Sequence, residues 1–164
     1  MTHVIEAGKA PSFWFMGMRG TILSHGGERA PTTVELILPP GGVTPLHLHE
    51  DDEDSGIVLE GSVKTWCDGE LIDVAPGAWA SLPRGRPHAQ LVTSGAPARV
   101  IAVYSNSHFA DFIAEVGTPA DRAPPPPGPP PPSEMPRLRE IAARHRLQIL
   151  GPAPAELLAF RRVP

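Results

Sequence analysis

The chain has 164 residues, of which 41% are hydrophobic and 20% are charged, and this composition suits one soluble domain with a hydrophobic core. The net charge of −4, without a basic cluster, argues against nucleic acid as a partner. The single cysteine excludes an internal disulfide, and neither a signal-peptide pattern nor a long apolar run indicates contact with a membrane. We therefore expect a cytoplasmic protein.

Short apolar runs separated by turn residues fill the chain from residue 13 to about residue 105. Glycine and proline interrupt these runs at regular spacing with no helical pattern between them, which predicts an antiparallel sandwich or barrel. The pair Asp68-Gly69 is typical of a type I′ hairpin turn. The expected strands are 13–16, 19–24, 32–38, 56–66, 70–74, 78–83, 87–93 and 98–105.

Helical periodicity begins only after these strands. Residues 107–117 carry apolar side chains on one face, with Ser107 as the expected cap. A second helix is expected over 133–147, with Ser133 as its cap, and a short last helix over 154–160. The sequence therefore predicts an all-β barrel with a C-terminal helical tail.

The composition stands out in its 22 prolines, eight of which lie within residues 123–132. Such a run favours an extended polyproline II segment, because proline fixes its backbone angle and lacks an N–H. It is either a ligand for an SH3-like partner or a semi-rigid strap across the barrel. We expect residues 1–106 to form the barrel with its N-terminal strands, and residues 107–164 to supply a helix, this strap and C-terminal helices packed on the barrel.

The stretch HLHEDDED, residues 47–54, places two histidines before five acidic residues. His47 and His49 share one face of a strand, because side chains alternate along it. A histidine pair alone is a weak signal for a metal. A third histidine, His88, follows the turn PRGRP, whose prolines and glycine fix the direction in which the next strand begins.

These residues together resemble the cupin superfamily. GVTPLHLHEDDEDSGIVLEG resembles the first cupin motif, and GAWASLPRGRPHAQ resembles the second. The tail is similar to that of small single-domain bacterial metal-binding cupins of the quercetin-dioxygenase-like kind. The resemblance implies a cupin jelly-roll barrel, also called a double-stranded β-helix. The positions that match the two motifs are Gly41, His47, His49 and Gly61 in the first, and Gly77, Pro83, Gly85 and His88 in the second.

The resemblance also implies one divalent transition metal per chain, Fe, Ni, Co, Mn, Cu or Zn, held by His47, His49, Asp54 and His88. Asp54 stands where the family usually has glutamate and is one methylene shorter. Three arrangements are open, since metal–oxygen distances tolerate errors of only ~0.2 Å. Asp54 binds directly after a strand shift, it acts one water away, or Glu53 replaces it through a bulge. The other three acids, 50–52, are expected in a solvated loop.

Three residues are candidates for binding a substrate beside the metal. Gly56 and Val58 share the face of Asp54 in an alternating strand, and Gln90 shares the face of His88. Gly56 either widens the pocket for a planar ligand or forms a bulge that corrects the short reach of Asp54. Gln90 is either a ligand contact or a structural amide.

For function, the resemblance implies an oxygen-dependent dioxygenase acting on a planar oxygenated small molecule of polyphenol or polyketide type. Asp54 is the candidate catalytic residue, as a metal ligand or as a general base. Two alternatives remain, because one fold hosts many functions. They are a metal-dependent isomerase, cyclase or dehydratase, and a cupin that binds a small ligand without catalysis. The resemblance also implies a homodimer, since cupins often pair or exchange N-terminal strands, here FWFM (13–16) and RGTILS (19–24).

Overall fold

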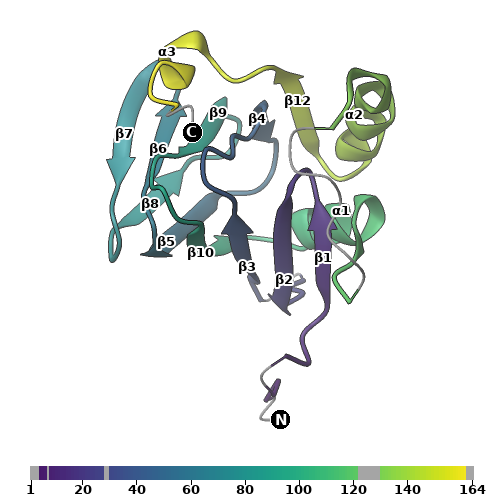
Figure 1. The fold of residues 1–164 in the computed structure, drawn as a ribbon. Coiled ribbons are helices and arrows are strands. Elements are labelled where there is room, and N and C mark those ends of the chain that lie inside the picture. Colours follow the sequence, from purple (N-terminus) through teal and green to yellow (C-terminus); the bar gives the residue numbers. More distant parts are fainter. Residues whose placement is uncertain (1–3, 7, 28–29, 122–129, 162–164) are drawn as a thin grey trace.

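The computed structural model describes residues 4–6, 8–27, 30–121 and 130–161 of the chain, which form two antiparallel sheets that enclose a barrel (Figure 1). The first sheet has seven strands and contains both the N-terminal strands and the strand that begins with Asp54. Its order is β11 (Thr118–Pro119), β1 (Ser12–Phe15), β2 (Met18–Ser24), β3 (Thr32–Leu38), β10 (Ala98–Tyr104), β5 (Asp54–Glu60) and β8 (Trp79–Leu82).

The second sheet has five strands and carries all three histidines of the two motifs. Its order is β12 (Leu147–Gly151), β4 (Leu46–His49), β9 (His88–Val92), β6 (Val63–Cys67) and β7 (Glu70–Val74). Seven of the expected strands agree with β1, β2, β3, β7, β8, β9 and β10 to within a few residues at their ends, whereas the expected strand 56–66 is divided between β5 and β6. The short strand β11 and the strand β12 were not expected. The jelly-roll fold class predicted from the sequence is confirmed.

Alternation of side chains explains why the barrel closes around an apolar interior. In β3, Val34, Leu36 and Leu38 are buried, whereas the residues between them are partly exposed. The hairpin between β6 and β7 turns at Asp68 and Gly69, both of which have positive φ angles, as the type I′ prediction requires. The apolar faces of the two sheets thus pack against each other inside the barrel.

The C-terminal segment differs in part from the prediction. Helix α1 (His108–Val116) forms as expected, but the Ser107 hydroxyl donates to Asp111 instead of capping a backbone N–H. A 3-10 turn η1 (Pro132–Glu134) precedes helix α2 (Met135–Arg144), so neither Ser133 nor residues 145–147 take their predicted places. The short helix α3 (Ala155–Leu158) is present.

The largest difference lies at residues 147–151, for which no strand was expected and which form strand β12 at the edge of the second sheet, whereas the predicted helix extended to residue 147. The segment LQILG is a short apolar run, and the sequence of such a run does not distinguish a helix end from a strand. In the structure Leu147 and Ile149 are buried. Its partner is β4, which carries His47 and His49. A segment expected to pack on the barrel therefore forms part of its wall.

The helices lie on two sides of the barrel (Figure 1). Helix α1 contacts α2 and β1, while α3 packs over β9 and β6. Among the described residues, no helix is long and apolar enough to cross a membrane. Most of the proline run, residues 122–129, lies outside the described residues, so neither interpretation of that run is tested.

Candidate metal centre

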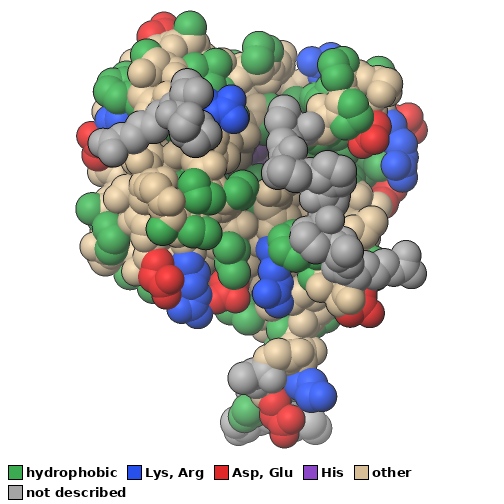
Figure 2. All heavy atoms as spheres, viewed as in Figure 1, with side chains coloured by type: hydrophobic (Ala, Val, Ile, Leu, Met, Phe, Trp, Pro, Cys, Tyr) green, Lys and Arg blue, Asp and Glu red, His purple; other side chains and the backbone are tan. Residues whose placement is uncertain are grey.

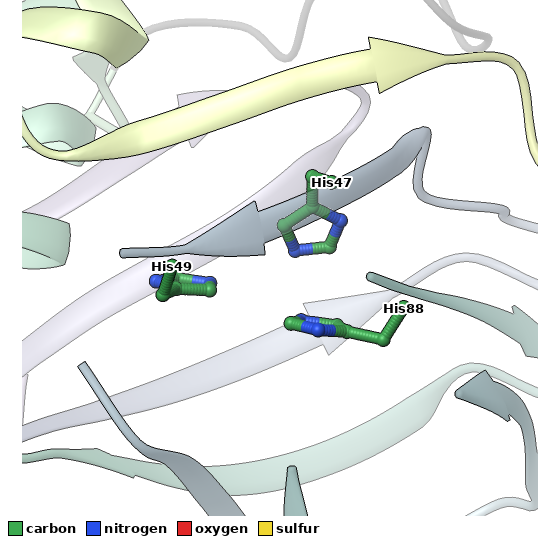
Figure 3. Close-up of side chains that lie close together, drawn as sticks. All are labelled: His47, His49 and His88. Atoms are coloured by element: carbon green, nitrogen blue, oxygen red, sulfur yellow. The ribbon is translucent and has the colours of Figure 1, made fainter. Parts of the chain in front are cut away.

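Three histidine side chains from two neighbouring strands point toward one another inside the barrel (Figure 3). His47 and His49 come from β4, and His88 begins β9. One ring nitrogen of each lies within 4.8 Å of the others, and His47 and His88 are direct partners across the two strands. The structure therefore brings together the three histidines that the sequence singled out.

The backbone around β4 fixes the direction of these histidines. β4 pairs with β9 at a single position, but with β12 at four. At the end of β4 the carbonyl of His49 accepts a hydrogen bond from the Gly85 N–H at 2.7 Å. Gly85 has a φ of 72°, which favours glycine, so the proline-glycine turn holds the end of the histidine strand as well as the start of β9.

Hydrogen bonds set the ring orientation of two of the histidines. Nδ1 of His47 lies 2.9 Å from the carbonyl of Pro45, and Nδ1 of His88 lies 2.9 Å from that of Arg86. When Nδ1 carries the proton and donates the hydrogen bond, Nε2 keeps a lone pair that can bind a metal. Nε2 of His88 and both ring nitrogens of His49 are buried without a hydrogen-bond partner among the described residues. Buried, unpartnered imidazole nitrogens facing one another fit a bound cation.

The electrostatics of the cluster favour neutral imidazoles. Burial, followed by the nearby His88, lowers the pKa of His49 to about 3. Burial also lowers the pKa of His47 well below its usual value, with His88 and His49 adding to the shift. A histidine must be neutral to bind a metal, so these two side chains are ready ligands at neutral pH.

Asp54 lies beside the histidines, on the facing sheet. One of its carboxylate oxygens, Oδ2, is 3.6 Å from Nε2 of His88 and 4.0 Å from Nε2 of His49. Tyr104, its register partner on β10, is buried beside the Asp54 carboxyl group. Burial and the adjacent Asp54 raise the pKa of Tyr104 well above its usual value, which keeps the phenol protonated as a donor. Glu53, by contrast, is exposed and does not join the cluster.

The expectation of a solvated loop is wrong for Asp52, whereas Asp51 is exposed and Glu50 is partly exposed. Asp52 is only 1% exposed, and its Oδ1 accepts hydrogen bonds from the Ser105 hydroxyl and the Asn106 N–H. Burial raises the pKa of the Asp52 carboxyl. Glu50 and Asp51 both pair with Arg146, at 3.1 and 2.7 Å. The acidic loop therefore ties the end of β4 to β12 and to the end of β10.

Two adjoining cavities inside the barrel meet at Asp54, and the candidate substrate-binding residues line them. Gly56 and Val58 line the first cavity, and Gln90 lines both. His47 lines the second, whose other walls are mostly apolar. In Figure 2 part of a histidine side chain is visible in a hollow of the molecular surface. The second cavity is lined by Phe15, Met16, Met18, Leu36, Leu38, Thr44, Pro45, His47, Asp54, Gln90, Tyr104, Phe109, Phe112, Leu147 and Ile149.

Gly56 is not a bulge. It pairs in regular register with Ala102 and Ala80, and the register of β5 shifts only between its partners Arg99 and Val100. A Cβ built on Gly56 would lie 2.7 Å from the carbonyl oxygen of Ile101. The close approach of the β10 backbone therefore explains why this position is glycine.

Sequence reasoning missed two aromatic residues of the site, Tyr104 and Phe109. Tyr104 is the only tyrosine of the chain and ends the strand paired with β5. Phe109 was assigned to the apolar face of α1, but the sequence does not say what that face covers. Its ring lies 5.4 Å from that of His49, centroid to centroid.

Comparison with known proteins agrees with this geometry. Residues 34–104 match a family model described as a cupin domain. The chain is 27% identical over 148 residues to a quercetin 2,3-dioxygenase from Bacillus subtilis. That match covers 87% of this chain but 43% of the relative, so the chain spans less than half the length of the relative.

Solved structures of similar fold include the polyketide cyclase RemF from Streptomyces resistomycificus, at 25% identity and a TM-score of 0.52, covering 63% of this chain and 79% of RemF. KdgF from Halomonas sp. gives 16% identity and a TM-score of 0.56, over 65% of this chain and 96% of KdgF. A predicted oxalate decarboxylase from Thermotoga maritima gives 18% identity and a TM-score of 0.55, covering 62% of this chain and 97% of the decarboxylase. The last two similarities concern the fold alone.

Proposed function

Since this chain belongs to the cupin superfamily and carries three clustered histidines in its barrel, we propose that it is a mononuclear transition-metal enzyme. The specific activity we propose is an oxygen-dependent dioxygenase reaction on a planar oxygenated small molecule of polyphenol or polyketide type. The similarity to quercetin 2,3-dioxygenase supports this choice. Three imidazoles suit Fe, Ni, Co, Mn, Cu or Zn, so the residues leave the metal's identity open.

The observation that carries the substrate proposal is the lining of the two cavities. Of the described residues that line them, none is lysine or arginine. An anionic group away from the metal would need such a partner, because burying an unpaired charge is costly. Apolar side chains surround the few polar groups, which are Asp54, Tyr104, Gln90 and His47 together with small hydroxyl side chains. This lining favours a flat, largely apolar ligand with a few oxygen atoms.

When bound, the metal would be held by His47, His49 and His88 and would supply an electrophilic centre for a substrate oxygen, which every metal named except Zn could also make redox-active. Asp54 Oδ2 faces this centre and is placed to accept the proton of a substrate hydroxyl. The Tyr104 hydroxyl, which lies beside Asp54, would hold this carboxylate by donating a hydrogen bond to it. The Gln90 amide offers a donor and an acceptor for a second substrate oxygen, while the apolar walls exclude water.

A redox-neutral reaction is the second candidate, as a metal-dependent isomerase, cyclase or dehydratase. The similarity to the polyketide cyclase RemF favours it, because RemF reaches 25% identity over most of its own length. The same three histidines and Asp54 would serve, with the metal acting on a carbonyl oxygen. A cupin that binds a small ligand without turnover is the third candidate.

Oxygen uptake separates these functions. The full chain, stripped of metal and reloaded with each of the six metals in turn, is mixed with quercetin or with a linear polyketide-like phenol. The proposal predicts that one metal supports substrate-dependent oxygen consumption. Product formation without oxygen consumption would favour the redox-neutral reaction, and metal binding without any turnover would favour the binding module. A chain that takes up none of the metals would contradict both enzymatic functions.

A further inference from the structure

His49 differs from the other two histidines in how its ring is oriented. Nδ1 of His47 and Nδ1 of His88 each lie within hydrogen-bond distance of a backbone carbonyl. Neither ring nitrogen of His49 has a hydrogen-bond partner among the described residues. A metal-bound histidine usually donates its second N–H to an acceptor, which fixes the ring. His49 must be oriented by other means.

Aromatic rings pack against His49 on more than one side. Its ring centroid is 5.3 Å from that of Tyr104, at an interplanar angle of 30°, and 5.4 Å from that of Phe109, at 62°. The Tyr104 and Phe109 rings lie 4.4 Å apart, so they form one continuous surface. His88 packs parallel to His49 at 5.5 Å. All of these side chains are buried, which leaves the His49 ring little room to rotate.

We infer that Phe109 is a positioning residue, which holds the His49 imidazole in the orientation for metal ligation in place of the usual hydrogen bond. The inference rests on the proposed metal site. Phe109 belongs to α1 and lies outside residues 34–104, the part of the chain that matches the cupin family. The C-terminal segment therefore contributes to the metal centre through packing, although it supplies none of the three histidines.

Phe112 provides a matched control. It lies three residues further along α1, is 2% exposed, and lines the same cavity. Its ring contacts are with Phe109 and His145, at 6.1 and 6.5 Å. Replacing Phe112 by leucine removes a similar volume from the same helix without removing the ring that packs on His49.

The test is a Co²⁺ titration of the metal-free full chain, followed by its visible absorption spectrum, in the wild type, Phe109→Leu and Phe112→Leu. Loss of an orienting residue near a metal ligand typically costs about 10- to 100-fold in metal affinity. We expect Phe109→Leu to bind Co²⁺ at least ~10-fold more weakly and to change the shape of the spectrum at saturation. Phe112→Leu is expected to match the wild type in both.

Three results would overturn the inference. A Phe109→Leu protein with the affinity and spectrum of the wild type would show that the ring does not position His49. Equal changes in both variants would assign the effect to the packing of α1 in general. If Phe109→Leu fails to fold, Phe109→Met removes the ring with less loss of volume, and wild-type behaviour of this variant refutes the inference equally. A wild type that binds no Co²⁺ would instead remove the proposed metal site.

Discussion

Gly56→Ala tests the close approach of the β5 and β10 backbones beside the metal centre. The added Cβ would lie 2.7 Å from the Ile101 carbonyl oxygen and 3.3 Å from Cα of Ala102. Both neighbours are backbone atoms of β10, which is paired on both edges, so neither can move without disturbing the sheet. Overpacking of this kind costs about 1–3 kcal/mol. For a chain of this size, 1 kcal/mol shifts Tm by about 2–4 °C, so we expect Tm to fall by about 2–12 °C.

Gly95→Ala is the control, because a Cβ at that exposed position would have no atom within 4 Å. It should change the free energy of unfolding by less than ~0.5 kcal/mol, or raise it slightly by restricting the unfolded chain. Urea denaturation measures both variants, and a lower midpoint with an unchanged slope identifies a loss of stability. A Gly56→Ala protein as stable as Gly95→Ala would refute the close approach.

Further predictions concern Asp54, β12 and the metal itself. Asp54→Ala is expected to keep stoichiometric metal but lose turnover, because three imidazoles remain while the proposed base is gone. If metal analysis finds no metal in this variant, Asp54 is a ligand instead. Ile149→Ala removes a buried side chain of β12 and should lower the free energy of unfolding by about 2–5 kcal/mol in urea denaturation. A loss below ~0.5 kcal/mol would mean that β12 contributes little to the fold. Removing the metal with a chelator should lower Tm, since a ligand at ~100 times its Kd adds about 2.7 kcal/mol. An unchanged Tm in a calorimetric scan would contradict metal binding to the folded state.

The barrel was predictable because its signals are local. Alternating apolar residues and turn residues mark each strand, and Asp68-Gly69 forms the expected turn. The last strand was not predictable in the same way. Residues 147–151 pair with β4 across about a hundred residues of sequence, and a short apolar segment after a helix carries no mark of such a distant partner.

The histidines of the site were predictable because the two motifs that contain them resemble those of cupins, with His47 and His49 on one face of a strand and His88 after a proline-glycine turn. What surrounds them depended on tertiary contacts. Asp52 looked like one of several solvated acids until Ser105 and Asn106 were seen to bind it. The aromatic surface on His49 joins residues from a strand and a helix that only the fold brings together.

Two of the untested expectations concern the assembly of the chain and its division. A homodimer through the N-terminal strands is one, although β1 already pairs with β11 of its own chain at Phe13 and Trp14. The other is the division into a barrel over 1–106 and a tail over 107–164, within which β12 belongs to a barrel sheet. Sedimentation of the full chain would decide the first.

A crystal structure of the metal-loaded protein, with anomalous scattering recorded at the absorption edge of the metal, decides whether the three histidines hold a metal ion. We expect an anomalous peak within ~2.0–2.3 Å of ring nitrogens of His47, His49 and His88. Absence of a peak between these rings, after reconstitution with each of the six metals, would contradict it.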